Sequence, residues 1–104
     1  MNAVSEDVEK LVEKELEAAN ERFPQFHSPH EGWAVMQEEA EELREECESI
    51  EMAMEQLWHR IRDGIPTEQH VALVEQYAEA AACEAIQVAA MARKYLDMLE
   101  RMDE

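Results

Sequence analysis

Glycine and proline, the residues that most often interrupt helices, are scarce in this sequence. Two glycines and three prolines occur among 104 residues. Alanine, glutamate, leucine and methionine, which favour helices, are abundant instead. This composition argues against a fold of strands and tight turns and predicts an all-α protein. The length predicts a single domain, residues 1–104, either alone or as one protomer of an assembly.

Basic residues and long apolar runs are also scarce. Nine lysines and arginines stand against 26 aspartates and glutamates, and the resulting net charge of −17 argues against a nucleic-acid partner. Divalent cations or basic proteins are the natural counterparts of such a chain. No stretch approaches the roughly 20 apolar residues that span a bilayer, and the first residues are acidic rather than signal-like. We therefore expect a cytoplasmic protein with no membrane partner.

Cysteine is rare as well. Cys47 and Cys83 lie within helical patterns and have no metal-ligand spacing, so we expect reduced, buried thiols. A disulfide between them is the alternative, because an antiparallel hairpin of the two helices that carry them brings them level.

Apolar residues recur every three or four residues in three segments, which predicts helices over 4–22, 29–62 and 68–102. Ser5 is a candidate cap for the first helix. For the second, Ser28 is the candidate cap, and Glu31 three residues later completes a capping box.

The two connections carry different signals. Gly64 and Pro66 predict a turn that ends the second helix, and Thr67 is placed to cap the third. Between the first two helices, Phe23 and Phe26 flank a proline. Two aromatic side chains in a loop are expected to pack against another part of the protein. They most often close the end of a core, and contact with a nucleobase is the alternative.

The second and third helices each carry a seam of apolar or small residues. The seams are Trp33, Met36, Ala40, Leu43, Cys47, Ile50, Met54, Leu57 and Ile61, and Val71, Val74, Ala78, Ala81, Ala85, Val88, Ala92, Tyr95 and Leu99. Each helix would be roughly 50 Å long, well beyond the ~34 Å diameter of a compact chain of this size. Because the first helix is too short to shield both, we predict a homodimer with a four-helix-bundle core.

Carboxylates are crowded beside the first seam. Glu39, Glu42 and Glu46 form a stripe at helical spacing. Within the alanine-rich segment 80–92, Glu84 is the only acid, and an unpaired buried carboxylate is unfavourable. A turn centred near residue 65 places Glu46 level with Glu84 in an antiparallel hairpin.

Gln87 shares a helix face with Glu84, so the hairpin gathers an all-oxygen set of side chains. Hard oxygen ligands on rigid helices suit Mg²⁺ or Mn²⁺. A charge run is more often simply a solvated helix face, and that alternative stays open.

The motif Glu38-Glu39-Ala40-Glu41-Glu42-Leu43 resembles the E-E-x-x-E-L of MazG-type all-α nucleoside triphosphate pyrophosphohydrolases. Glu84-Ala85-Ile86-Gln87 stands where that family has E-x-x-D, and residues 30–35 and 84–93 are similar to small phage-type members. The resemblance covers about residues 20–97. It implies an oligomeric helical protein in which Mg²⁺ binds a nucleoside triphosphate, which water cleaves to a monophosphate and pyrophosphate.

By the match to this family, Glu39, Glu42 and Glu84 would be metal ligands, and Gln87 would take the position of the last aspartate. Glu38 or Glu46 could supply the missing carboxylate. Glu38 is the candidate that orients or deprotonates the attacking water.

Four further residues are candidates for substrate binding. Arg93 and Lys94 follow Glu84 on its helix and could clamp phosphate, although cations late in a helix commonly serve its dipole. Trp33 is a candidate for base stacking and His30 for a substrate contact. The alternatives are a core aromatic and a surface histidine.

A second class of function fits the same sequence. A non-catalytic, acidic helical interaction or scaffold protein, such as a phage accessory protein that kept the fold, could bind a basic partner through its −17 surface. Gln87 favours this alternative, because it stands where the family has an aspartate and so leaves the site with one negative ligand fewer. A nucleic-acid mimic is a variant of the same idea.

Overall fold

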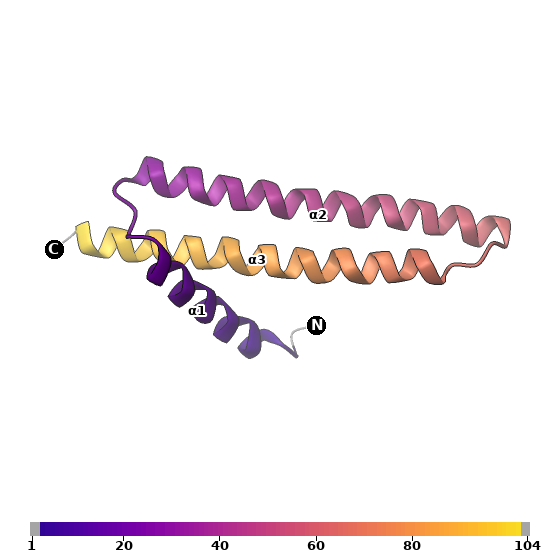
Figure 1. Ribbon diagram of the computed structural model, residues 1–104, viewed down its shortest axis with the longest axis horizontal. Helices are drawn as coiled ribbons and strands as arrows, with labels where there is room; N and C mark the ends of the chain where they lie inside the picture. The colour runs from indigo at the N-terminus through magenta and orange to yellow at the C-terminus, as the bar shows by residue number, and fades with distance from the viewer. Residues whose placement is uncertain (1–2, 103–104) are drawn as a thin grey trace.

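The computed structural model describes residues 3–102, and these form three helices and no strand (Figure 1). The helices are α1 (Ser5–Arg22), α2 (Pro29–Asp63) and α3 (Glu68–Met102). The all-α prediction is confirmed, and each observed boundary lies within one residue of the expected one. None of these helices is both long and apolar enough to cross a membrane.

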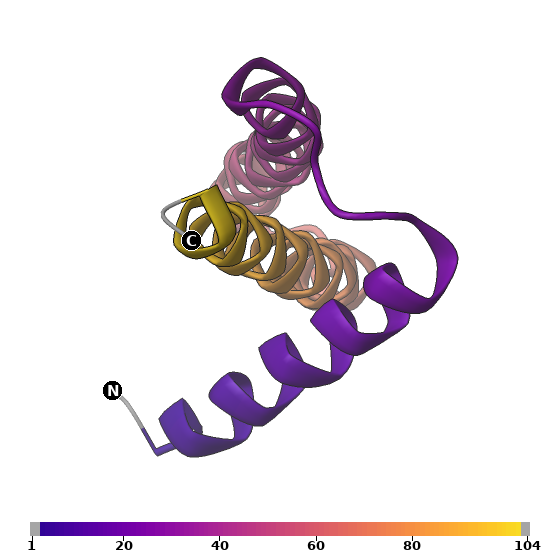
Figure 2. The ribbon, with the colours of Figure 1, turned by 90° about the vertical axis from the view of Figure 1, so that its left-hand side faces the viewer.

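The long helices α2 and α3 form an antiparallel hairpin, and the molecule measures 63 × 28 × 23 Å. α1 is about half their length and crosses α3 near the end remote from the hairpin turn (Figure 1). Both α1 and α2 pack against α3, on different sides of it (Figure 2), and within the described residues they do not pack against each other. A hollow lined by residues of all three helices lies between α1 and α2, with α3 as its floor.

The start of α2 is fixed as expected. The Ser28 hydroxyl accepts a hydrogen bond from the Glu31 backbone N–H at 3.2 Å. The Glu31 carboxylate, however, accepts from the His27 backbone N–H at 3.2 Å and contacts the His27 ring nitrogen at 3.0 Å. The capping box therefore closes on the residue before the cap.

The other helix ends give mixed results. Gly64 has φ 67° and ends α2 in the left-handed conformation, as predicted. The prediction for Ser5 is wrong: Ser5 is the first residue inside α1 and Val4 stands at the cap position. No side chain among residues 3–102 forms a capping hydrogen bond at this end. The carbonyl of Thr67 accepts the backbone N–H groups of His70 and Val71 at the start of α3, and no side-chain cap from Thr67 is observed.

The predicted register of the hairpin is wrong by about four residues, roughly one helical turn. Glu42, rather than Glu46, stands across from Glu84. The reason is the path of the connection, which runs back beside α2, so that α3 starts short of the end of α2 (Figure 1). The carbonyl of Pro66 accepts a hydrogen bond from the Arg60 guanidinium at 3.2 Å, which keeps the connection against the last turns of α2.

Burial is concentrated in one half of the hairpin. We call residues 29–46 and 80–102 the proximal half, where α1 and the segment 23–28 lie, and residues 47–79 the distal half. Phe26, Gly32, Ala90, Lys94 and Met98 are buried at the proximal half, whereas Ala53 alone is buried in the distal half.

The cysteine prediction is half confirmed. Cys47 and Cys83 are free thiols, as expected, but both are exposed rather than buried.

Candidate metal site and adjoining cavity

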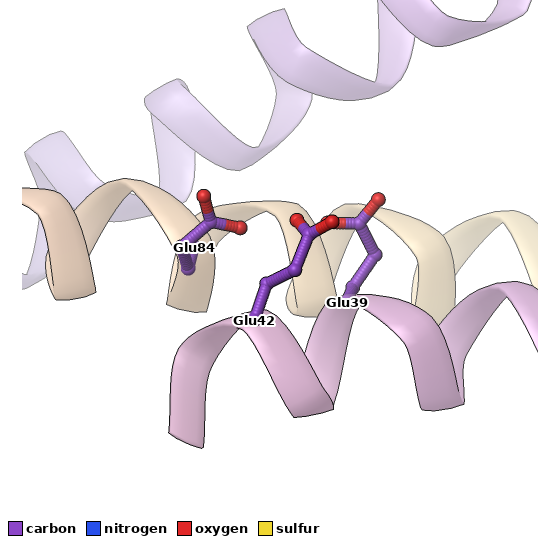
Figure 3. A group of neighbouring side chains, drawn as sticks. All are labelled: Glu39, Glu42 and Glu84. Atoms are coloured by element: carbon purple, nitrogen blue, oxygen red, sulfur yellow. The ribbon is translucent and has the colours of Figure 1, made fainter. Parts of the chain in front are cut away.

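Three carboxylates converge across the hairpin. Glu39 and Glu42 lie on one face of α2 because three residues separate them, and Glu84 reaches them from α3 (Figure 3). One oxygen atom of each carboxylate lies within 4.8 Å of the others. Helices on both sides hold the backbone of this triad, so its convergence does not depend on a loop.

Like charges and partial burial disfavour ionisation of the triad. The pKa of Glu39 is raised mainly by desolvation and further by the charges of Glu42 and Glu84. The pKa of Glu84 is raised mainly by desolvation. A hydrogen bond with Glu42 and the negative charge of Glu42 raise it further. A proton or a cation between these oxygens would relieve the repulsion, and a divalent cation does so without removing the carboxylate charges.

Gln87 joins the triad, one turn after Glu84. With its amide turned so that the nitrogen faces the carboxylates, it donates to Glu39 Oε2 at 2.7 Å and to Glu84 Oε2 at 3.2 Å. With its oxygen in the same position, it would add a fourth oxygen to the set. Rotation of one amide therefore lets the residue serve either a cation-free or a cation-bound site.

The other two glutamates of the predicted site lie at its edge. Glu46 is half-buried, and its negative charge contributes to the raised pKa of Glu84. Glu38 is exposed and precedes Glu42 by one turn. Neither belongs to the triad.

A cavity of about 480 Å³ adjoins the triad. Its walls come from α1, the segment 23–26 and α2, and its floor comes from α3. Glu39 and Gln87 line it at the triad end, and Lys94 lines it two turns further along α3. This volume lies within the range of about 300–1,000 Å³ that is usual for small-molecule sites.

Lys94 is the most deeply buried charged residue of the described chain, with 2% of its surface exposed. Its amine lies over the Phe26 ring, 5.1 Å from the ring centre. Burial lowers the pKa of this amine, and the negative charge of Glu31 opposes part of that shift. The backbone is held too, because the Gln25 amide donates to the Lys94 carbonyl at 3.1 Å and accepts from the Phe26 N–H at 2.7 Å.

The structure separates the four substrate-binding candidates. Lys94 lines the cavity, whereas Trp33, His30 and Arg93 do not. Trp33 is 62% exposed, and His30 and Arg93 are also exposed. Only one of the four therefore adjoins the space beside the triad.

Several residues that line the cavity were not among the site residues predicted from the sequence. Glu15 and Arg22 come from α1, and Phe23 and Phe26 from the segment after it. The pair of aromatics around Pro24 was the available signal. No sequence signal pointed to the charged residues of α1. The face of α3 that α1 covers is determined by packing between the helices, which local periodicity does not reveal.

Comparison of the chain with protein-family models, with curated proteins and with solved structures finds no match.

Proposed function

We propose that this protein is a Mg²⁺- or Mn²⁺-dependent nucleoside triphosphate pyrophosphohydrolase of the MazG type. In this reaction water cleaves the bond between the α- and β-phosphates and yields a nucleoside monophosphate and pyrophosphate. The observation that carries the proposal is the convergence of Glu39, Glu42 and Glu84 beside a cavity of about 480 Å³. The sequence motif that resembles the family contains these same residues.

The side chains fit a hard divalent cation. Glu39, Glu42 and Glu84 would hold it, Gln87 could add a neutral oxygen, and the set contains no sulfur or nitrogen ligand. When bound, the ion would neutralise phosphate oxygens and lower the pKa of water. It would also allow a chain with a net charge of −17 to bind a polyanion.

The remaining glutamates provide the general base. The half-buried Glu46 next to Glu84 and the exposed Glu38 are the two candidates to accept the proton of the attacking water. Both charges act on the triad, that of Glu46 on Glu84 and that of Glu38 on Glu39, and Glu46 is the less exposed of the two.

We further propose that the working form is a homodimer with a four-helix-bundle core. Four of the nine seam positions on each long helix are exposed in the single chain: Trp33, Cys47, Met54 and Ile61 on α2, and Val71, Ala78, Ala85 and Leu99 on α3. A second hairpin would cover them, and small alanine side chains allow close approach of helices.

The test is pyrophosphate release from a panel of ribo- and deoxyribonucleoside triphosphates with Mg²⁺ or Mn²⁺. Glu39→Gln and Glu84→Gln should each lower turnover about a hundredfold or more, because each removes charge that the ion needs. Glu55→Gln is the matched control, since this glutamate is exposed on α2 away from the triad. Absence of pyrophosphate from every nucleotide would refute the proposal.

One observation favours a second candidate function, a non-catalytic helical module that binds a basic partner. The Gln87 amide can hydrogen-bond Glu39 and Glu84 together, which holds the triad without a cation. On this alternative, Mg²⁺ and Mn²⁺ would leave the melting temperature unchanged. A rise in melting temperature with either ion that Glu84→Gln abolishes would count against it.

A further inference from the structure

The end of the cavity remote from the triad contains the amine of Lys94, a residue of which only 2% is exposed. Among the residues that the structure describes, none forms an ion pair or hydrogen bond with the Lys94 amine, which lies over the Phe26 ring. A donor with so little access to bulk water is stabilised by an acceptor that a ligand supplies. The cavity that Lys94 lines is the space from which an acceptor can come.

The position of Lys94 separates it from the triad. Lys94 follows Gln87 by seven residues and Glu84 by ten on the same helix, which corresponds to roughly 10 and 15 Å along the axis. These lengths are comparable with the separation of the base from the outer phosphates in an extended nucleotide. A nucleotide with its phosphates at the triad would bring its base toward Lys94.

The charges around the cavity argue against a phosphate at this end. Glu15, Glu31 and Glu39 line the cavity with negative charge, against the positive charges of Arg22 and Lys94. Glu31 acts electrostatically on the amine, so the positive charge there is already opposed. A neutral group with an acceptor oxygen meets less repulsion here than a polyanion does.

The apolar surface around the amine suits a flat ring. Phe23 lines the same cavity and 63% of its surface is exposed, so much of this aromatic residue is free to contact a ligand. Phe26 is buried and positions the amine from one side. A planar aromatic ligand could cover Phe23 while it accepts a hydrogen bond from Lys94.

We propose that Lys94 and Phe23 form a nucleobase subsite that selects bases with a ring carbonyl oxygen, such as uracil, thymine or guanine, over adenine. The Lys94 amine donates to the carbonyl oxygen, and the base stacks on Phe23. This inference rests on the proposed function, since it assigns the base of the same substrate.

The test uses binding without metal, so that it does not depend on hydrolysis. Uridine and adenosine are titrated in the presence of a chelator into full-length protein labelled with ¹³C at the methionine methyl groups, and the signals are followed by NMR. Met91 lines the cavity, and Met52 lies in the distal half as an internal control. Uridine should shift the Met91 signal, leave Met52 unchanged and bind more tightly than adenosine.

Two substitutions identify the role of the amine. Lys94→Met keeps the length of the side chain and should weaken uridine binding about tenfold or more, with little effect on adenosine. Lys94→Gln retains a donor and should recover part of the loss. An equal loss for both nucleosides, or no loss in Lys94→Met, would overturn the proposal.

Inorganic phosphate and pyrophosphate are titrated in parallel. If either one shifts Met91 and displaces uridine, Lys94 binds phosphate and the base assignment is wrong. Pyrophosphate release without a uridine response at Met91 would retain the proposed function and reject this subsite. A uridine response without pyrophosphate release would retain the subsite and reject the hydrolase.

Discussion

The proximal and distal halves of the hairpin carry the same apolar periodicity but differ in how much of it is buried. In the proximal half, α1 and the segment 23–28 add a third layer over α3, and all but one of the buried residues lie there. In the distal half two helices meet alone, and the large apolar side chains Met52, Met54, Trp58, Ile61, Ile65 and Val71 are exposed. Two helices cannot shield each other all round, so burial follows the third layer rather than the sequence pattern.

The difference between the halves also locates the candidate site. The triad lies where the third layer begins, and the cavity extends from it beneath α1 into the proximal half. In the distal half, the described residues place no comparable set of carboxylates together. Covering by α1 therefore gives the proximal half a space for a ligand, whereas the bare distal half is suited to a partner helix.

The largest expected effect comes from placing a charge on the exposed distal seam. Met54→Glu should raise the dissociation constant of the proposed dimer about a hundredfold or more, because a carboxylate would be buried against a second hairpin. Sedimentation equilibrium of the purified parent and variant proteins measures this dissociation constant. Met52→Glu is the matched control: Met52 is 62% exposed and Met54 50%, and the two residues point to opposite sides of α2. A monomeric parent protein, or equal effects of both substitutions, would contradict the dimer.

A smaller effect is expected from a close helix contact in the proximal half. A Cβ atom at Gly32 would overlap the Tyr95 ring and crowd Phe26. Gly32→Ala should therefore lower the free energy of unfolding by about 1–3 kcal/mol, although the same change at an open helix position raises it by about 1 kcal/mol. Urea denaturation measures the change.

Two further variants separate packing from backbone effects in that experiment. Gly64→Ala tests the distal turn, where no atom lies near the missing Cβ and only the φ of 67° disfavours alanine, by about 1–2 kcal/mol. Adding Tyr95→Leu to Gly32→Ala should recover part of the loss. Stabilisation by Gly32→Ala alone would show that the two helices are further apart here.

The smallest effect concerns the charge that the proximal half buries. The pKa of Lys94 is lowered from its usual 10.5 in the folded protein, so unfolding takes up a proton between the folded pKa and about 10.5. Stability contributed by this group therefore rises with pH across that window. Lys94→Met should stabilise the protein by about 1 kcal/mol at pH 7, and the gain should shrink at pH 10.

Urea denaturation of both proteins at pH 7 and pH 10 measures this difference. Lys14→Met, at an exposed position of α1, is the control and should show no such dependence. If the gain at Lys94 were the same at both pH values, the amine would be solvated in the folded protein.

Much of the fold could be predicted from local patterns. The boundaries of three helices follow from apolar spacing, from Ser28 at the start of α2 and from Gly64 at its end. These signals act within one or two turns of the chain, so they need no knowledge of the partner helix. Ser5 failed as a cap because several residues near the start of α1 could begin the helix, and none is held by packing.

The candidate site could be predicted only in part. The pairing of Glu39 with Glu42 follows from their spacing, and the isolation of Glu84 among alanines marked it as unusual. The level at which these residues meet was misjudged by about one turn, because the path of residues 64–67 is not encoded in helical periodicity. The roles of Trp33, His30 and Arg93 stay predictions without support from the cavity.

By itself, the sequence determined the helices, the apolar seams and the stripe of carboxylates, because each depends on neighbours a few residues apart. Only the tertiary structure decided that Glu42 meets Glu84, that α1 covers one half of α3, and that Lys94 is buried against Phe26. These outcomes depend on contacts between residues more than 40 positions apart in the chain. Such contacts are selected by the fit of whole helix faces, which no short stretch of sequence specifies.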